Sequence, residues 1–406
     1  MTDRVIVIGA GHAAGQLSAR LRAEKYAGEV VIVGDEPVLP YQRPPLSKAY
    51  MSGEIGLERV VMRTQKFYDD NNIDVRTGVR VTGFDTASRT VTLDSGESLE
   101  YSHVVLATGT RARTLALAGA ELGAIHVLRS LADSDAVSAA LDTAKRMVVV
   151  GGGYIGLEVA AVARKRGLEV VVLETMDRIL ARTTSARTAQ HVMEVHASND
   201  VEIRLKASVA GFRGNAAGQV DGVMLDSGEV VPADVVVLGV GVLPNEELAV
   251  EAGLEVDNGV VVDARGATSD PHVWAVGDCT RHPSRLYGKK IRLESVQNAM
   301  SQAKVVAANI AGNEAEYDEV PWFWTDQYDL KLQSVGLIDD IDDFVTRGDP
   351  SSGSFTVFAL RDGHVIGAES VNSMRDHMEC RRLAGAQVQV DSATLADPEV
   401  VLKELT

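Results

Sequence analysis

The chain opens with two short apolar runs separated by a segment with helical spacing. The runs cover residues 5–8 and 30–33 and are rich in Val and Ile. Such uninterrupted runs are typical of parallel strands that are buried on both faces. Between them, Leu17 and Leu21 recur on one helix face, and Gly28 is the expected stop of that helix. The pattern predicts a strand–helix–strand unit.

The same order of elements recurs in the middle of the chain. A strand is expected over 147–150, a helix over 151–166 and a second strand over 169–173. Two strand–helix–strand units in one chain indicate a repeat of architecture, which carries more weight than either copy alone.

A strand-rich stretch follows each of the two units. Residues 73–106 and 201–238 alternate in polarity and are rich in Val and Thr, which favours strands. The turn sequence Asp-Ser-Gly interrupts both stretches, at 94–96 and at 226–228. The resemblance between the two halves therefore extends beyond the first strand–helix–strand unit.

The pattern changes after about Pro321. Short strands are expected around 332–335, 355–360 and 365–368, and four aspartates lie between them within 339–343. These aspartates are interpreted as a solvated turn, because no other group with metal-ligand spacing accompanies them. The fold class predicted for the whole chain is α/β, with two Rossmann-like dinucleotide-binding domains plus a small C-terminal α/β domain.

A glycine-rich loop follows the first strand and reads Gly9-Ala-Gly11-His-Ala-Ala14. Gly9 allows a tight turn, Gly11 lets the backbone approach a pyrophosphate, and Ala14 permits close strand–helix packing. The helix N-terminus would stabilise the anion. Asp35 ends the second strand, where an acid can hold a ribose hydroxyl. A lone motif of this kind also fits a tight turn in another α/β protein, but the order of elements favours a dinucleotide site.

The second loop reads Gly151-Gly-Gly153-Tyr-Ile-Gly156, a complete G-x-G-x-x-G between a strand and a helix. The next strand ends in Glu174. A carboxylate there accepts both ribose hydroxyls of NADH and repels the 2′-phosphate of NADPH, so NADH is favoured. Arg178 and Arg182 follow closely and leave NADPH open, since either could hold a phosphate.

Composition narrows the class of protein. The 406 residues carry a net charge of −17, which argues against a nucleic-acid binder or a protein of anionic membranes. The apolar run near the N-terminus is too short for a secretory signal, and a cytoplasmic protein is expected. Only two cysteines occur, Cys279 and Cys380, without metal-ligand or disulfide spacing. No metal site is therefore expected.

Several further segments resemble one family specifically. The chain resembles the two-dinucleotide-binding-domain flavoproteins and, among them, the FAD-dependent ferredoxin reductases of the putidaredoxin-reductase type. The segments that carry this resemblance are Ala-Thr-Gly at 107–109, Ala-Val-Gly-Asp-Cys at 275–279, Arg-Pro-Pro-Leu-Ser-Lys at 43–48, Ser-Asp-Pro at 269–271, Glu-Ser-Val at 294–296 and Pro-Trp-Phe-Trp-Thr-Asp-Gln at 321–327, together with the second glycine loop.

The resemblance implies three site features. Asp278 would hydrogen-bond the ribityl chain of FAD. A helix that starts after Ser295 and runs to about Ile310 would point its positive end at the flavin. Lys48 beside the flavin would pair with Glu158, and this pair would orient the nicotinamide. For Glu158, the alternative is a solvent-facing helix acid that stabilises the helix dipole.

The resulting assignments are as follows. Residues 1–111 and 242–320 form the FAD-binding domain, 112–241 the NADH-binding domain and 321–406 the C-terminal domain. Lys48 and Glu158 are the candidate catalytic residues. The candidate FAD-binding residues are Gly9, Gly11, Ala14, Asp35, Arg43, Lys48, Thr108, Arg129, Asp278, Val296 and Trp324. The candidate NAD-binding residues are Gly151, Gly153, Ile155, Gly156, Glu158, Glu174, Arg182 and Gly241.

The absence of cysteines beside the expected flavin site limits the class of electron acceptor. Disulfide reductases, peroxidases and oxidases of this fold need one or two reactive cysteines beside the flavin, and residues 37–51 contain none. Cys279 is expected to be a buried, inert thiol. The resemblance implies an NADH-dependent ferredoxin reductase, which passes hydride from NADH to FAD and single electrons to a two-iron ferredoxin that serves an oxygenase. The alternatives are an NADH oxidase or quinone reductase, and a flavin-binding interaction protein related to apoptosis-inducing factor.

A basic stretch suggests where the partner docks. Residues 280–293 contain five cations and no acid: Arg281, Arg285, Lys289, Lys290 and Arg292. Ferredoxins of this type are acidic, so the basic stretch could steer one toward the flavin. A solvated loop that only aids solubility is an equal alternative. A monomer or weak homodimer is expected.

Overall fold

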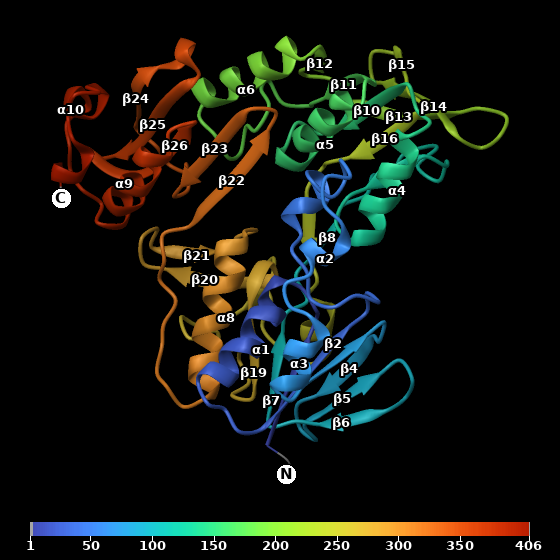
Figure 1. Ribbon diagram of the computed structural model, residues 1–406, viewed down its shortest axis with the longest axis vertical. Helices are drawn as coiled ribbons and strands as arrows, with labels where there is room; N and C mark the ends of the chain where they lie inside the picture. Colours follow the sequence, from blue (N-terminus) through green and yellow to red (C-terminus); the bar gives the residue numbers. More distant parts are fainter. Residues whose placement is uncertain (1–2, 406) are drawn as a thin grey trace. The chain divides into compact units, whose positions relative to one another are not determined.

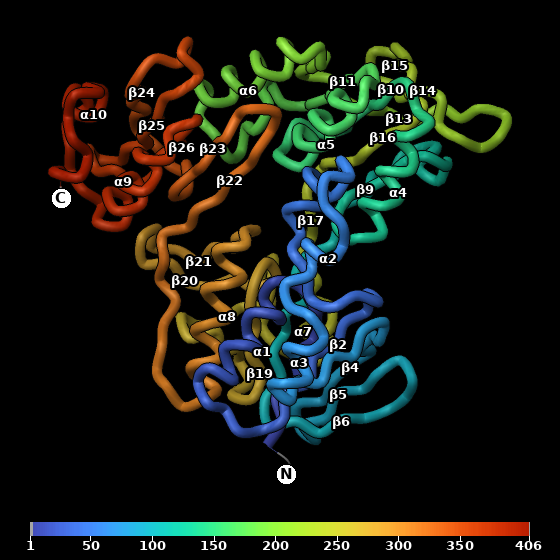
Figure 2. The backbone as a smooth tube through the Cα atoms, viewed as in Figure 1, coloured from blue at the N-terminus to red at the C-terminus, as the bar shows by residue number. Residues whose placement is uncertain are grey.

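The computed structural model describes residues 3–405 (Figures 1 and 2). By its contacts the chain divides into two compact units, each assembled from separate segments. The first unit consists of Met1–Arg43, Ile55–Arg111 and Val242–Glu319. The second consists of Pro44–Glu54, Ala112–Gly241 and Val320–Thr406.

The first unit is built on a five-stranded parallel sheet in the order β19-β7-β1-β2-β3. These strands are β1 (Arg4–Ile8), β2 (Glu29–Gly34), β3 (Ile73–Thr77), β7 (His103–Leu106) and β19 (Val273–Ala275). Alternate side chains of β1 and β2 point to opposite faces, and both sets are buried. The prediction of strands buried on both faces is confirmed.

Helices cover one face of this sheet, and a small antiparallel sheet covers the other. Helices α1 (His12–Ala23) and α8 (Val296–Ile310) pack against each other on the first face (Figure 1). The small sheet contains β4 (Val81–Asp85), β5 (Thr90–Leu93) and β6 (Ser98–Glu100). The remaining elements are α2 (Leu57–Val60), α3 (Gln65–Asp70), β8 (Thr110–Ala112), β17 (Val242–Pro244), α7 (Glu247–Glu251), β18 (Val260–Val261), η2 (Gly277–Cys279), β20 (Thr280–Ser284) and β21 (Lys289–Ile291).

The second unit repeats this plan with the sheet order β12-β11-β10-β16-β9. Its parallel strands are β9 (Ile125–Val127), β10 (Arg146–Val150), β11 (Glu169–Leu173), β12 (Val201–Arg204) and β16 (Val235–Leu238). Its helices are α4 (Leu131–Leu141), α5 (Tyr154–Lys165) and α6 (Ala186–Ser198), and its antiparallel sheet is β13 (Val209–Gly214), β14 (Val220–Leu225) and β15 (Val230–Pro232). Strand β9 comes before β10 in the chain, whereas its counterpart β19 comes far after β1.

The C-terminal part of the second unit is an antiparallel sheet in the order β22-β23-β26-β25-β24. Its elements are β22 (Trp322–Gln327), β23 (Leu330–Val335), β24 (Asp343–Asp349), η3 (Pro350–Ser352), β25 (Ser354–Arg361), β26 (His364–Val371), α9 (Met374–Gly385), α10 (Ser392–Ala396) and η4 (Leu402–Leu405). One face of the sheet packs on α9 and α10. The other joins the core that surrounds α5 and α6.

Residues 44–54 make their contacts in the second unit, although the sequence-based division placed them with the FAD-binding domain. They begin with the 3₁₀ turn η1 (Pro44–Ser47). Two serines of α4 tie the segment down, since Ser134 donates to the carbonyl of Leu46 at 2.7 Å and Ser138 to that of Met51 at 3.2 Å. Polar side chains on α4 thus fix a segment that is far away in the sequence.

The expectation that the first helix runs to Gly28 is wrong. Helix α1 ends at Ala23, and Lys25 takes the left-handed backbone conformation, with φ of 64°. The N–H of Tyr26 then donates to the carbonyl of Leu21 at 3.0 Å, which closes the helix end. Helix α5 ends in the same way with Gly167 at the left-handed position. A lysine in this role gives no glycine signal in the sequence.

Within residues 3–405, none of the helices combines the length and the apolar character needed to cross a membrane.

Candidate functional site

The first glycine loop has the geometry of an anion-binding turn. Gly9 has φ of 110°, and a Cβ there would lie 2.3 Å from the carbonyl oxygen of Ala107, so no other residue fits. Helix α1 starts with Gly11 as its N-cap, and its first turn has neither a capping side chain nor an acid. Because neither a capping side chain nor an acid lies at the start of this helix, an anionic ligand such as a pyrophosphate can bind there.

The turn η2 and the start of α8 each bring one further candidate residue beside this loop. A Cβ on Gly277 would lie 3.4 Å from that of Ala13 and 3.6 Å from that of Ala299, so Gly277 packs between the first turns of α1 and α8. Asp278 follows directly and is half-buried. Val296 opens α8, whose N-cap is Ser295, as predicted. The first unit therefore gathers Asp278 and Val296 at its glycine loop.

Arg43 lies at the same loop, with a partner that sequence reasoning missed. Its Nε is 4.0 Å from the place that a Cβ would take on Gly11. Its guanidinium donates to Glu36 and to the hydroxyl of Tyr41, each at 3.0 Å. The Tyr41 hydroxyl in turn donates to Glu36 at 2.6 Å. Glu36, rather than its neighbour Asp35, is the carboxylate connected to the loop in this unit.

Asp35 is mostly exposed, and its ion-pair partner is Arg80 at 3.6 Å. The pairing register explains this position. In the two units, Gly9 and Gly151 donate to Val33 and Leu173, each at 2.8 Å. The residue after Leu173 is Glu174, but the residue after Val33 is Gly34. Asp35 thus stands one residue beyond the place of the strand-end acid, and its ribose-binding role stays a prediction.

Thr108 and Cys279 make structural contacts. The hydroxyl of Thr108 donates to the carbonyl of Asn245 at 2.7 Å, and the Asn245 amide donates back to the carbonyl of Thr108 at 2.8 Å. Cys279 is fully buried, and burial raises the pKa of its thiol, so the thiol is protonated near neutral pH. The expectation that Cys279 is buried is confirmed, and its inertness stays a prediction. The role of Thr108 at a flavin stays a prediction.

The second glycine loop repeats the geometry of the first. Gly151 has φ of 107°, and its Cβ would lie 2.5 Å from the carbonyl oxygen of Gly239. Gly153 is the N-cap of α5, again with no capping side chain and no acid in the first turn. Ile155 exposes 44% of its surface beside the loop. Gly241, with φ of 95°, follows β16 with open space around its Cβ position.

Glu174 is held on this loop by backbone donors. It accepts from the N–H of Gly152 at 2.8 Å and from that of Met176 at 2.9 Å. Arg178 is occupied elsewhere, because its guanidinium donates to the carbonyls of Thr184 and Ala181 at 2.6 and 2.9 Å. Of the two arginines that left NADPH open, Arg182 is exposed, whereas Arg178 is half-buried and bound to backbone carbonyls.

Lys48 and Glu158 form an ion pair within the second unit. Nζ of Lys48 lies 2.7 Å from Oε1 of Glu158, which is only 2% exposed. The carboxylate also accepts from the hydroxyls of Ser47 and Thr325. A solvent-facing helix acid does not fit this burial. The pair is thus present as expected, while its catalytic role stays a prediction.

The remaining candidates of the second unit are Arg129 and Trp324. The N–H of Arg129 donates to Asp133 at 3.0 Å, beside the capping box of α4. Trp324 lies on β22 and stacks on Trp322, with ring centroids 5.5 Å apart. Both residues were assigned to FAD from the sequence, and they belong to the unit that does not carry the first glycine loop.

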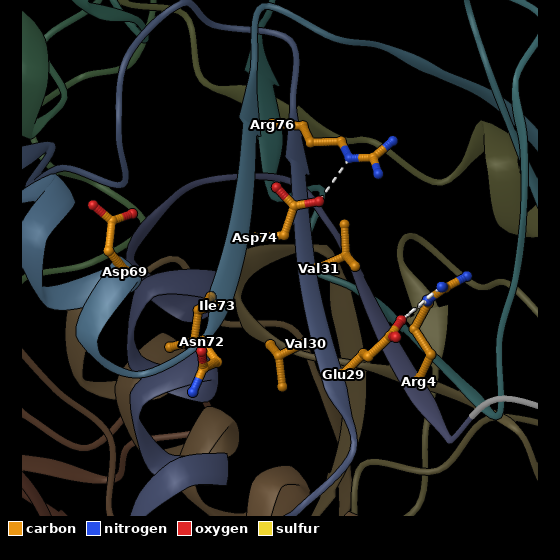
Figure 3. A pocket seen from close by; sticks show the side chains of 9 residues that line it. All are labelled: Arg4, Glu29, Val30, Val31, Asp69, Asn72, Ile73, Asp74 and Arg76. Atoms are coloured by element: carbon orange, nitrogen blue, oxygen red, sulfur yellow. Dashed lines mark hydrogen bonds and ion pairs between the residues drawn. The ribbon is translucent and has the colours of Figure 1, made fainter.

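The first unit also has a cavity of about 350 Å³, whose lining residues are shown in Figure 3. Arg4 and Glu29 line it at the starts of β1 and β2, whereas the glycine loop follows the end of β1. Four of its charged side chains form ion pairs, Arg4 with Glu29 at 2.6 Å and Arg76 with Asp74 at 2.9 Å. The cavity therefore has no part in the dinucleotide sites.

In the part of the chain that the structure describes, no group of three or more His, Cys, Asp or Glu side chains is arranged to hold a metal ion.

Two family models together match nearly the whole chain. Residues 3–303 match the pyridine nucleotide-disulphide oxidoreductase family, and residues 322–406 match the reductase C-terminal domain. The chain belongs to this oxidoreductase family. Membership identifies it as an oxidoreductase that uses FAD and a nicotinamide dinucleotide. The two uncapped glycine-loop helices fit these ligands.

Individual relatives match over their full length. A ferredoxin–NAD(P)+ reductase of a Sphingomonas species is 43% identical, with 99% of this chain and 98% of the relative covered. The solved ferredoxin reductase for the CYP199A2 system from Rhodopseudomonas palustris is 40% identical, with a TM-score of 0.96 and 99% of both chains covered. The covalent putidaredoxin reductase–putidaredoxin complex matches with 38% identity and a TM-score of 0.96, covering 99% of this chain and 98% of that one. The resemblance inferred from the sequence is confirmed.

Proposed function

We propose that the protein is an NADH-dependent ferredoxin reductase that supplies an oxygenase with electrons through a two-iron ferredoxin. The observation that carries the proposal is the full-length match to a reductase solved in covalent complex with putidaredoxin. Two glycine loops of the same geometry, one in each unit, support the binding of two dinucleotides. A cytoplasmic location goes with this role and is also a proposal.

FAD, when bound, supplies the chemistry by taking a hydride and returning its two electrons one at a time. Gly9, Gly11 and Ala14 would cradle its pyrophosphate, and Asp278 would bind its ribityl chain. Lys48 and Glu158 would orient the nicotinamide and set the charge beside the flavin. The residues proposed to complete the flavin site are Arg43, Thr108, Arg129, Val296 and Trp324, with Asp35 as the ribose ligand inferred from the sequence.

The two cysteines support direct electron transfer to a one-electron acceptor. Disulfide chemistry, which gives the family its name, needs a pair of thiols. Both Cys279 and Cys380 are buried, and they belong to different units. Burial also raises the pKa of the Cys380 thiol. With neither thiol ready to relay electrons, a ferredoxin is favoured over a disulfide substrate.

Glu174 supports NADH as the preferred donor. Its carboxylate is fixed at the second loop by the N–H of Gly152, where it would accept the ribose hydroxyls and repel a 2′-phosphate. Gly151, Gly153, Gly156, Ile155 and Gly241 would line the rest of the nicotinamide dinucleotide site. Arg182 would approach its phosphates.

The basic stretch 280–293 is a weaker candidate for docking than its sequence suggested. Acids pair with cations of this stretch: Arg281 with Asp257, Arg285 with Glu316, Lys290 with Glu255, and Arg292 with the adjacent Glu294. Docking of an acidic ferredoxin here requires exchange of these surface pairs, which are individually weak. We keep it as a proposal. Unchanged rate and salt dependence in an Arg285→Glu, Lys290→Glu double variant would eliminate it.

Stopped-flow reduction with NADH, followed by steady-state turnover with a two-iron ferredoxin, oxygen and a quinone, tests the proposed function. Rapid flavin bleaching with ferredoxin as the fastest acceptor supports it. Rapid bleaching with oxygen or quinone as the only efficient acceptor would replace it with an oxidase or quinone reductase. Slow transfer to every acceptor, with a long-lived complex of NADH and the protein, would favour an interaction protein.

A further inference from the structure

A row of buried, hydrogen-bonded polar side chains connects Glu158 with His196 inside the second unit. The hydroxyl of Thr325 lies 2.5 Å from Oε1 of Glu158, and Nε2 of Gln327 lies 3.1 Å from that hydroxyl. Oε1 of Gln327 is 2.8 Å from Nε2 of His196. Thr325, Gln327 and His196 are each at most 1% exposed. Buried polar groups are costly unless they are hydrogen-bonded, so this row has a definite arrangement of protons.

The direction of every hydrogen bond in the row is fixed by chemistry. The Thr325 hydroxyl has one proton, which goes to the carboxylate, so its oxygen accepts from the amide of Gln327. The carbonyl oxygen of Gln327 must then accept from Nε2–H of His196. Burial lowers the pKa of His196, which keeps the ring neutral with its proton on Nε2. Nδ1 has no hydrogen-bond partner among the described residues, in agreement with this tautomer. All donors therefore point toward Glu158.

The row connects three elements of the second unit. Thr325 and Gln327 are two residues apart on β22 and share the face of the strand that packs on α5 (Figure 1). Glu158 is on α5 and His196 on α6. Phe323, on the same face, packs against Tyr154 at the second glycine loop, with ring centroids 4.5 Å apart. The first strand of the C-terminal sheet thus contributes side chains to the glycine-loop helix.

We propose that Thr325 is a positioning residue that, with Gln327 and His196 behind it, fixes the orientation of the Glu158 carboxylate toward Lys48. Oε1 of Glu158 pairs with the ammonium of Lys48 and accepts a hydrogen bond from the Thr325 hydroxyl. Oε2 accepts a hydrogen bond from the Ser47 hydroxyl. Three donors from two separate segments restrict a side chain that otherwise has several rotamers. The proposal rests on the proposed function, because it assigns Glu158 to the nicotinamide site.

A matched pair of variants at Thr325 tests the proposal in the holoenzyme. Thr325→Val keeps the shape and removes the donor, whereas Thr325→Ser keeps the donor. We expect Thr325→Val to raise the dissociation constant for NAD+ and the KM for NADH about tenfold, as for a lost hydrogen bond to a charged group, with a smaller change in kcat. The midpoint potential of the bound flavin should shift as well. Thr325→Ser should stay within about twofold of the parent in both constants.

A double-mutant cycle separates positioning from general packing. In a Glu158→Gln background the charged acceptor is replaced by a neutral amide oxygen, so Thr325→Val should add a much smaller change in NAD+ affinity or flavin potential. Gln327→Met, which removes the next donor, should shift the same quantities in the same direction by a smaller factor. Equal behaviour of the valine and serine variants, or an undiminished effect of Thr325→Val in the Glu158→Gln background, would overturn the proposal.

The outcome can be separated from the fate of the proposed function. If NADH does not reduce the flavin of the parent protein, the proposed function fails. If the parent is reduced rapidly and accepts ferredoxin, but the variants at Thr325 and Gln327 match it in NAD+ affinity and flavin potential, only the positioning role fails.

Discussion

The two glycine loops share the geometry of their turns but differ where a ribose would lie. Both start with a glycine at φ near 110°, whose N–H donates to the end of the adjacent strand at 2.8 Å. Both lead into a helix without a side-chain cap. The second has Glu174 at the strand end, whereas the first has Gly34 there.

The difference comes from the second position of each loop. The first loop has Ala10, and a Cβ on Gly34 would lie 2.4 Å from that of Ala10. The second loop has Gly152 instead. Glu174 can therefore occupy the strand end and accept a hydrogen bond from the N–H of Gly152. A side chain fits at one of these two places but not at both. The first unit must take its acid from further along the chain, where Glu36 is joined to Arg43.

The largest effect should come from the third glycine. A Cβ on Gly156 would lie 2.3 Å from the carbonyl oxygen of Gly151, although Ala14 is accommodated at the matching place of the first loop. We expect Gly156→Ala to raise the KM for NADH about 100-fold, for strain near 3 kcal/mol. The flavin spectrum should persist. Ala14→Gly is the control, with a stability loss of about 1 kcal/mol and unchanged NADH kinetics. Normal NADH kinetics in Gly156→Ala would show that the second loop does not require glycine at its third position.

Acid should affect the first unit's site more than the second's. Burial lowers the pKa of His282 to about 4, and its Nδ1 accepts from Gln302, whose oxygen accepts from the N–H of Gly277. Because the folded-state pKa is below the ordinary value, His282 contributes stability above pH 6.5, and this is lost as pH falls toward 4. The loss is up to about 3 kcal/mol.

Flavin release and unfolding, followed from pH 7 to 4.5, check this expectation. His282→Gln should flatten the pH dependence of flavin release. Burial also lowers the pKa of His377 to about 4, but that residue lies in the second unit, so His377→Gln should flatten only the pH dependence of unfolding. Identical flavin-release curves for the parent and His282→Gln would show that this histidine does not support the Gly277 turn.

The strand-end acid of the second loop should have an intermediate effect. Glu174→Ala leaves the N–H of Gly152 without its acceptor and removes a negative charge. We expect the KM for NADH to rise about tenfold, since a charge-assisted hydrogen bond is lost. The KM for NADPH should fall. Asp177→Asn removes one charge from the exposed turn that follows Glu174 and should alter neither constant. An unchanged ratio of NADH to NADPH efficiency in Glu174→Ala would contradict the role given to this acid.

The smallest effects are expected for two neighbouring acids of the first unit, Asp35 and Glu36, whose variants should differ in FAD affinity. Glu36→Gln weakens the contacts to Arg43 and Tyr41, so FAD affinity should fall several-fold, by roughly 1 kcal/mol. Asp35→Asn changes an exposed side chain and should leave FAD affinity within about twofold. Flavin fluorescence during titration of the apoprotein measures both. The reverse ranking would show that FAD affinity depends more on Asp35, the proposed ribose ligand, than on Glu36 and its contacts.

Periodicity and loop motifs in the sequence predicted the repeated strand–helix–strand units, the turns and the Ser295 cap, because these depend on neighbouring residues. Features set by distant segments were missed. Most of the acids that pair with the 280–293 stretch come from 255–257 and 316–318. The contacts of 44–54 depend on serines of α4. The row of polar side chains from Glu158 to His196 joins residues of three elements that are far apart in the sequence. No spacing or motif in the sequence predicts it.

The placement of the edge strands has a consequence for synthesis on the ribosome. Strand β9 leaves the ribosome before the strands it joins, so the second sheet can close once β16 is made. Strand β19 is separated from its neighbour β7 by roughly 170 residues, or about 10–30 s at usual elongation rates. During that interval the nascent first sheet has an open edge at β7, a template for wrong pairing. We expect chains truncated shortly before Val273 to depend on chaperones for solubility.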